Sequence, residues 1–339
     1  MTVAVRASSS PTIREQRPAR VIALIFSLCL LVAVATLGLG AVRVPEPRAL
    51  EALFGHGSVD QVRVVRDFEL PRILIAFLVG SALAVSGAVV QSVIRNPLAS
   101  PDVIGVTKGA GLGALVVVLT FEAAAISYLA VAAFCGGVAA MVIVYVASYR
   151  GGGTTPVRLA LVGIAVSALC ESLIRYLMIT HQTGVVSALV WLTGSLAAVS
   201  SSTVVQYVPW WVALMSLTVV YVHKLDVLAL GDDVASGLGV AVERTRRTTL
   251  FLAVLLASST VAVAGALSFV GLVAPHVARR LVGSRMSVLL PCSAGVGALL
   301  LLVADAFGRA VHPPIEVPAG MITAVIGAPY FIYLLARSA

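Results

Sequence analysis

The chain has 339 residues, of which 60% are hydrophobic and only 11% are charged, and its mean hydropathy is +1.05. This composition excludes an ordinary soluble domain and predicts an all-α polytopic membrane protein. The net charge of +8 does not indicate a nucleic-acid partner, because the basic residues lie mainly in short segments that flank apolar runs.

The first apolar run, 21–42, follows a basic tail at residues 1–20 that holds four arginines and one glutamate. The positive-inside rule therefore places this end in the cytoplasm. A cleaved signal peptide is the alternative, because residues 33–35 (AVA) resemble a cleavage site. The run is long for a signal core, however, and more spans follow. We expect two regions, the tail at 1–20 and a single membrane domain at 21–337.

Nine further apolar segments bring the number of expected spans to ten. The polar loops between them alternate between the two sides of the membrane, and both termini are expected in the cytoplasm. Small residues in the run at 72–94 indicate a helix inside the bundle. The segment TGSL (193–196) is expected to begin a short helix on the outer side. The expected spans after the first are 72–94, 109–125, 126–149, 159–180, 203–222, 248–269, a short piece at 271–281, 287–307 and 320–335.

Catalytic and cofactor motifs are missing from the sequence. There is no G-x-x-x-x-G-K-[ST] loop, so any ATP and Mg²⁺ would be bound by a separate ATPase chain. The five histidines show no metal-ligand spacing, and the four cysteines are scattered through apolar runs. We therefore predict no catalytic residue, no metal site and no cofactor in this chain.

Polar residues inside the spans need an explanation, because charges in the bilayer are costly. Glu171 and Arg175 are spaced i, i+4, as are Asp305 and Arg309, so each pair can neutralise itself. The alternative is that such residues face a translocation path or, for Arg309, project outward as a docking charge. The expected set of path or intramembrane polar residues is Gln91, Glu171, Arg175 and Asp305.

The stretch 225–247, LDVLALGDDVASGLGVAVERTRR, interrupts two apolar runs. Its two aspartates after a glycine resemble a helix N-cap, and later glycines would end that helix after about two turns. A calcium loop would need more oxygen ligands. We therefore expect two short helices that dock on a cytoplasmic partner, with a framework of Leu228, Gly231, Asp232, Asp233, Gly237, Leu238 and Gly239.

Motifs along nearly the whole chain resemble those of the FecCD-type permeases, the membrane subunits of bacterial ABC importers for iron–siderophores, haem and cobalamin. The GDD and VERTR segments look most like a ferric-enterobactin permease subunit. The matching motifs are LPRIL (70–74), SGAVVQ (86–91), RNPLASPDVIG (95–105), WLTGSL (191–196), LALGDDVASGLGV (228–240), AGALSFVGLVAPHVARR (264–280) and VPAGMITAVIGAPYFIYLL (317–335).

The resemblance implies a type II ABC importer permease fold that dimerises around a central path. It also implies two cytoplasmic ATPase subunits, whose clefts receive the loop at 228–240, and an extracytoplasmic binding protein. Glutamates of that protein would dock on exposed Arg72 and Arg309. Glu69 stands where the family often has an arginine, so either Arg66 substitutes one turn earlier or the partner's charge pattern differs.

The expected function is that of a permease subunit of an ATP-driven importer for a ferric siderophore, located in the bacterial cytoplasmic membrane. A second, related permease is favoured over an identical chain as its dimer partner. Import of haem or cobalamin on the same fold is the alternative. An ion-coupled secondary transporter is disfavoured, because only Glu171 lies well within a span and it has a partner.

Overall fold

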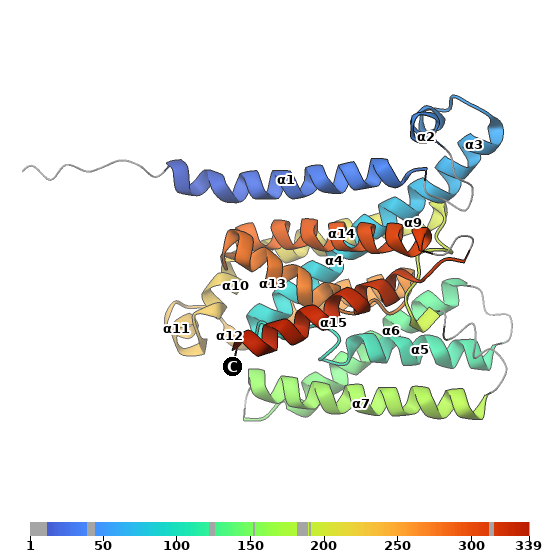
Figure 1. The fold of residues 1–339 in the computed structure, drawn as a ribbon. Helices are drawn as coiled ribbons and strands as arrows, with labels where there is room; N and C mark the ends of the chain where they lie inside the picture. The colour runs from blue at the N-terminus through green and yellow to red at the C-terminus, as the bar shows by residue number, and fades with distance from the viewer. Residues whose placement is uncertain are drawn as a thin grey trace, which may run out of the picture.

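The computed structural model describes residues 12–38, 45–121, 126–151, 153–181, 189, 191–311 and 315–338. These residues are mostly helical, and their extended pairing is limited to an isolated bridge between Arg150 and Gly153. The long helices run roughly along one common axis (Figure 1). Seven helices of the described chain are long and apolar enough to cross a membrane.

Among the described residues, ten helices correspond to the ten expected spans, and five short helices lie at the two ends of the bundle. The ten are α1 (Thr12–Thr36), α4 (Leu70–Ile94), α5 (Val106–Thr120), α6 (Ile126–Ser148), α7 (Pro156–Thr180), α9 (Ser201–Val220), α12 (Val242–Ala264), α13 (Val270–Val282), α14 (Met286–Ala310) and α15 (Ala319–Ser338). The short ones are α2 (Glu46–Leu53), α3 (Val59–Arg63), the π-helix η1 (Val64–Glu69), α10 (Val222–Ala229) and α11 (Asp232–Gly237).

Helix α4 is buried along nearly its whole length, which confirms the predicted interior helix. It packs against α9, α12, α13 and α14. A Cβ atom at Gly80 would overlap the backbone of Gly297, and one at Gly87 would overlap the carbonyl oxygen of Gly271. Glycine is needed at these positions because the helix backbones touch there, as small-residue contacts between membrane helices allow.

A break, the non-helical segment at residues 265–269, separates α12 from α13. Gly265 and Phe269 both have left-handed backbone angles, with φ of 73° and 67°. The turn at 193–196 lies against this break, and the amide of Ser195 donates to the carbonyl of Ala264 at 2.9 Å. The prediction that TGSL begins a helix is therefore wrong, because Gly194 forms a non-helical turn that contacts Ala266.

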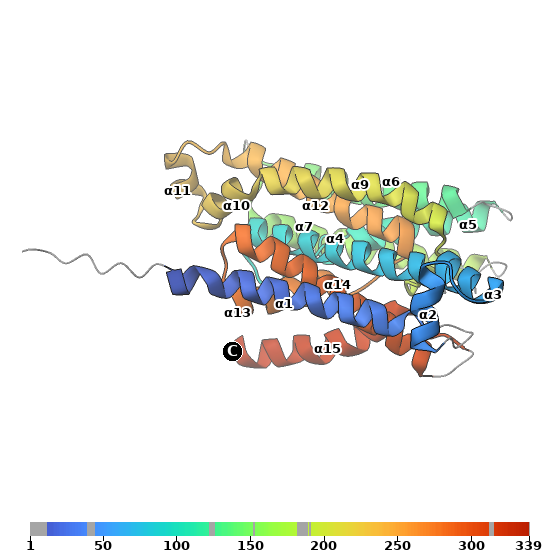
Figure 2. The same ribbon diagram turned by 90° about the horizontal axis from the view of Figure 1, so that it is seen from above.

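The two ends of the bundle carry different short helices. Helices α10 and α11 lie at one end, where α1 also begins and α15 finishes (Figure 1). Helices α2 and α3 lie at the other end, as the view from above also shows (Figure 2). We call these the α11 end and the α2 end.

Candidate functional site

The stretch 225–247 folds into two short helices and the start of α12, as expected. Helix α10 begins three residues earlier than the stretch, at Val222. The N-cap of α11 is Gly231, with φ of 116°, and no side chain caps the helix. The prediction of an aspartate N-cap is therefore wrong, because Asp232 and Asp233 are the first two helical residues.

Asp232 points into the protein and joins three elements. Its two carboxylate oxygens accept hydrogen bonds from Nη2 of Arg246, both at 2.8 Å. Oδ1 also accepts a hydrogen bond from Nη2 of Arg95 at 2.9 Å. Arg246 stands in α12 and Arg95 ends α4. Asp232 therefore connects α11 to α12 and to the end of α4, two largely buried helices of the bundle.

The connection continues into the loop between α6 and α7. Nη1 of Arg246 donates to the carbonyl of Thr154 at 2.6 Å. Glu243 accepts hydrogen bonds from the hydroxyl of Tyr145 at 2.6 Å and from the amide of Thr154 at 3.1 Å. The sequence shows these residues only as part of a charged helix start. The i, i+3 spacing of Glu243 and Arg246 is the one sequence signal of this network, and it was not used to predict their ion pair.

The outer face of the two short helices is apolar and open. Leu230, Val234 and Leu238 are 64%, 49% and 63% exposed, and Asp233 lies exposed beside them. Gly237 and Gly239 are also exposed, and a Cβ atom there would contact nothing. Leu228, in contrast, is buried. The predicted framework therefore divides into residues that face the bundle, Leu228 and Asp232, and residues that face outward.

A second charged cluster lies at the α2 end. Nε of Arg72 donates to both carboxylate oxygens of Asp305, at 3.0 and 3.1 Å, and Nη1 donates to Glu316 at 2.8 Å. Nη1 of Arg309 donates to Glu69, and its Nε lies 3.1 Å from Asp305. The cluster joins η1 and α4 to α14. It contains the i, i+4 pair that the sequence indicates.

The expectation that Arg72 and Arg309 are exposed charges is wrong. Their side chains are 11% and 2% exposed, because each guanidinium is surrounded by carboxylates of the same chain. Glu69, where an arginine was expected, is the partner of Arg309. Arg66 is exposed, but its Nε donates to the carbonyl of Leu53 at 3.0 Å and holds the turn after α2. A docking role for these arginines stays a prediction.

The remaining polar residues form local contacts. Gln91 is buried, and its side chain donates to the carbonyl of Leu272 at 3.2 Å, so it joins α4 to α13. Nε of Arg175 lies 3.2 Å from Glu171, as the spacing indicates. Glu171 has a second partner that the sequence did not reveal, Lys108 of α5 at 2.6 Å. In the described part of the chain, no group of three or more potential ligands could hold a metal ion.

Comparison with known proteins places these features in context. The model of the FecCD transport family matches residues 28–337. The Fe(3+)-citrate import system permease protein YfmE of Bacillus subtilis is 42% identical, covering 96% of this chain and 97% of that protein. The Fe(3+) dicitrate transport system permease protein FecD of Escherichia coli is 43% identical, covering 90% and 94%.

Two further similarities concern the expected subtype and the fold. The ferric enterobactin transport system permease protein FepG of Escherichia coli is 36% identical over 92% of this chain and 94% of its own. The two citrate permeases are thus more similar than this enterobactin permease. The structure of a metal-chelate type ABC transporter in an inward-facing conformation matches with a TM-score of 0.84 and 30% identity, covering 94% of this chain and 99% of that chain.

Proposed function

The chain belongs to the FecCD transport family, and we propose that it is the permease subunit of an ATP-driven importer that carries a ferric siderophore across the bacterial cytoplasmic membrane. Relatives named as permeases for ferric citrate, ferric hydroxamate and ferric enterobactin support the cargo class. The single observation in the fold that carries the mechanism is the pair α10–α11, whose outer face is apolar and which Asp232 ties to α12 and to the end of α4.

The assembly that this function needs contains several other chains. A second permease, favoured as a related rather than an identical chain, would complete the translocation path. Two ATPase subunits would bind the exposed face formed by Leu230, Val234 and Leu238. A binding protein would deliver the chelate at the α2 end. ATP is assigned to the partners because this sequence holds no phosphate-binding loop.

The α11 end is assigned to the cytoplasm. Arg279 and Arg280 close α13 at that end, and Arg14, Arg17 and Arg20 lie in the first turns of α1 there, in line with the positive-inside rule. Both termini would then lie in the cytoplasm, and α2 and α3 would lie on the outer side.

The geometry around Asp232 supplies a route for the coupling. When the ATPase pair closes, it would displace α10 and α11. Both carboxylate oxygens of Asp232 accept hydrogen bonds from the same nitrogen of Arg246, and hydrogen bonds between ionised groups are short and strong, so Asp232 would pull Arg246 and the start of α12 with it. Its bond to Arg95 would carry the same displacement to the end of α4. Rigid helices that move together in this way can switch a path between outward-open and inward-open states.

Uptake of radiolabelled iron by cells with and without this chain tests the proposal. The iron is supplied as citrate, catecholate, hydroxamate and haem complexes. We expect loss of uptake for one ferric chelate, and the same loss on ATP depletion. Unchanged uptake for every iron source would contradict the iron cargo. Uptake that persists without ATP but stops when the ion gradient is collapsed would contradict the ATP-driven class.

A further inference from the structure

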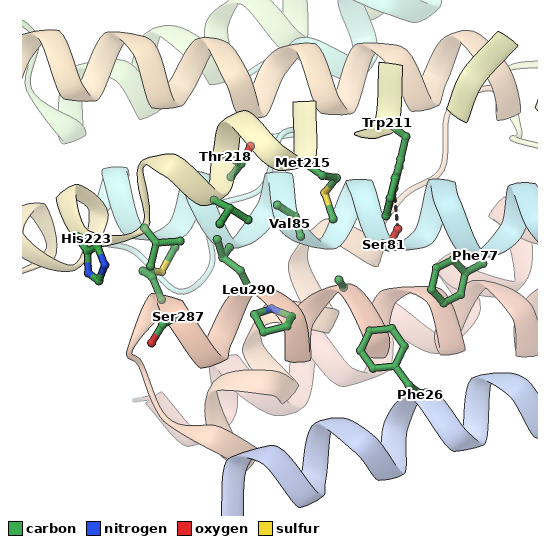
Figure 3. Close-up of a pocket in the computed structure, with 15 residues that line it drawn as sticks. Phe26, Phe77, Ser81, Val85, Trp211, Met215, Thr218, His223, Ser287 and Leu290 are labelled. Carbon is green, nitrogen blue, oxygen red and sulfur yellow. Dashed lines mark hydrogen bonds between the residues drawn. The ribbon is translucent and has the colours of Figure 1, made fainter. Parts of the chain in front are cut away.

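A cavity of about 520 Å³ lies between α1, α4, α9, α10 and α14, and none of its lining residues belongs to the two charged networks. Its volume is in the range of small-molecule sites. Figure 3 shows its walls, with Phe26 and Phe77 at one end and His223 and Ser287 at the other. The cavity is therefore elongated along the bundle axis, with aromatic side chains at one end and polar side chains at the end next to α10.

The polar atoms in the body of the cavity are already occupied. Nε1 of Trp211 donates to Oγ of Ser81 at 3.0 Å, and that hydroxyl donates to the carbonyl of Leu78 at 2.8 Å. The hydroxyl of Thr218 donates to the carbonyl of Leu214 at 2.8 Å. A ligand in this part of the cavity would find only apolar surface and satisfied groups. A ferric chelate, with its many oxygen atoms, does not fit such a lining.

The α10 end of the cavity is basic. His223 lines this end and is exposed, and the exposed Lys224 and Arg285 are the chain neighbours of the lining residues His223 and Met286. Asp226 accepts a hydrogen bond at Oδ1 from the amide of Met286 at 2.7 Å and keeps its charge, so Lys224 and Arg285 stand against this one carboxylate. The site thus combines an apolar channel with a positively charged mouth.

The cavity lies on the side of the bundle away from α7. From above, α4 is visible between α9 and α1, so these two helices flank the cavity on that side (Figure 2). A crevice on the outside of a membrane bundle is filled by whatever the bilayer supplies. The occupant with an apolar chain and an anionic end is a phospholipid.

We propose that this cavity binds one acyl chain of an anionic phospholipid, with the headgroup phosphate held by His223, Lys224 and Arg285. The acyl chain would end between Phe77 and Trp211, at the end of the cavity away from α10. Attraction between basic side chains and anionic headgroups supplies the preference for charge. The bound lipid would bridge α14 and the α9–α10 corner, directly behind the helices that face the proposed ATPase.

Native mass spectrometry of the full chain in detergent, with added phosphatidylglycerol or phosphatidylcholine of the same acyl chains, tests the site. We expect one phosphatidylglycerol retained per chain and at least about tenfold less phosphatidylcholine. Ala294→Phe narrows the cavity from α14 and should abolish the retention. Ala213→Phe is the matched control, because Ala213 is exposed on α9 and does not line the cavity. Equal retention by the two variants would overturn the proposal.

Two further measurements keep the test decisive if Ala294→Phe fails to fold. Lys224→Gln with Arg285→Gln should remove the preference for phosphatidylglycerol and leave the weaker phosphatidylcholine binding unchanged. A persistent preference would overturn the headgroup assignment. In a protein variant that keeps Trp211 as its only tryptophan, phosphatidylglycerol with brominated acyl chains should quench the Trp211 fluorescence. The quenching should saturate at one lipid per protein. Quenching that rises without saturation would overturn the discrete site.

Discussion

At the α11 end, Arg246 is 2% exposed, while its partner Asp232 is 38% exposed and stands on a six-residue helix. At the α2 end, Arg309 is also 2% exposed, but its partners Glu69 and Asp305 are 7% and 3% exposed. These two acids stand on long, continuous helical segments. The buried arginines are alike, and the carboxylates that face them differ in exposure and in what carries them.

This difference distinguishes an ion pair that can shift when its helix moves, at the α11 end, from ion pairs that hold two helices in a fixed position, at the α2 end. Asp232 is partly exposed, and its partner Arg246 also pairs with Glu243, so this ion pair can shift with its helix at a limited cost in desolvation. Glu69 and Asp305 are both buried, so loss of their partner Arg309 would leave an unpaired charge in a dry interior. The α11 end is suited to passing on a displacement. The α2 end is suited to keeping two helices together while the rest of the bundle moves.

The largest expected effect is on stability, from Arg309→Met. Glu69 would remain buried without its guanidinium partner, and removing one member of a buried pair costs about 3–5 kcal/mol. Thermal unfolding of the detergent-purified chain should shift strongly downward. The double variant Arg309→Met with Glu69→Leu should recover most of the loss, because it removes both charges. A single variant that unfolds at the native temperature would show that the cluster is not a clamp.

The next effect is on transport, from Asp232→Asn. The neutral amide offers Nη2 of Arg246 one oxygen acceptor in place of two charged ones, and a hydrogen bond to a charged group contributes about 1.5–3 kcal/mol. We expect iron uptake to fall about tenfold or more while the assembled transporter still hydrolyses ATP. Asp67→Asn is the matched control, because Asp67 lies at the opposite end of the bundle, is exposed and forms no ion pair with another described residue. If both variants transport equally well, Asp232 does not carry the coupling.

A smaller effect is expected from Glu316→Gln at the rim of the α2-end cluster. Glu316 is 28% exposed, and Arg72 keeps its bonds to Asp305 when Glu316 is neutralised. The free energy of unfolding should change by less than about 1 kcal/mol. Chemical denaturation in detergent measures the change. A loss as large as that of Arg309→Met would mean that the rim, too, belongs to the clamp.

The smallest effect is expected from Arg175→Ala, which gives a baseline for an exposed pair. Arg175 is 74% exposed, and Glu171 keeps Lys108 as its partner. An exposed i, i+4 pair contributes about 0.3–0.5 kcal/mol. Unfolding and uptake should both stay close to native. Lys108→Ala is the informative comparison, because it removes the contact between α5 and α7 instead of a contact within one helix.

Features that depend on neighbouring residues in the sequence were predicted well. The spans follow from apolar runs, α13 from its proline and terminal arginines, and the Asp305–Arg309 pair from its i, i+4 spacing. The bond from Arg72 to Asp305 joins residues 233 positions apart, and no local pattern contains it. The same holds for Arg246 and Thr154, 92 positions apart. The burial of the predicted docking arginines therefore required the packed structure.

The short length of α13 bears on how the protein is made. Thirteen helical residues extend about 20 Å, which is less than the roughly 30 Å of a bilayer core. The carbonyl of Ala264 before the break finds its donor, Ser195, some 70 residues earlier in the chain, and the amide of Gly320 at the start of α15 bonds to Gly194. During synthesis, the segment after α12 therefore emerges before α15 exists to cover it. Packing of α13 against α15 can therefore follow only after the last helix has left the ribosome.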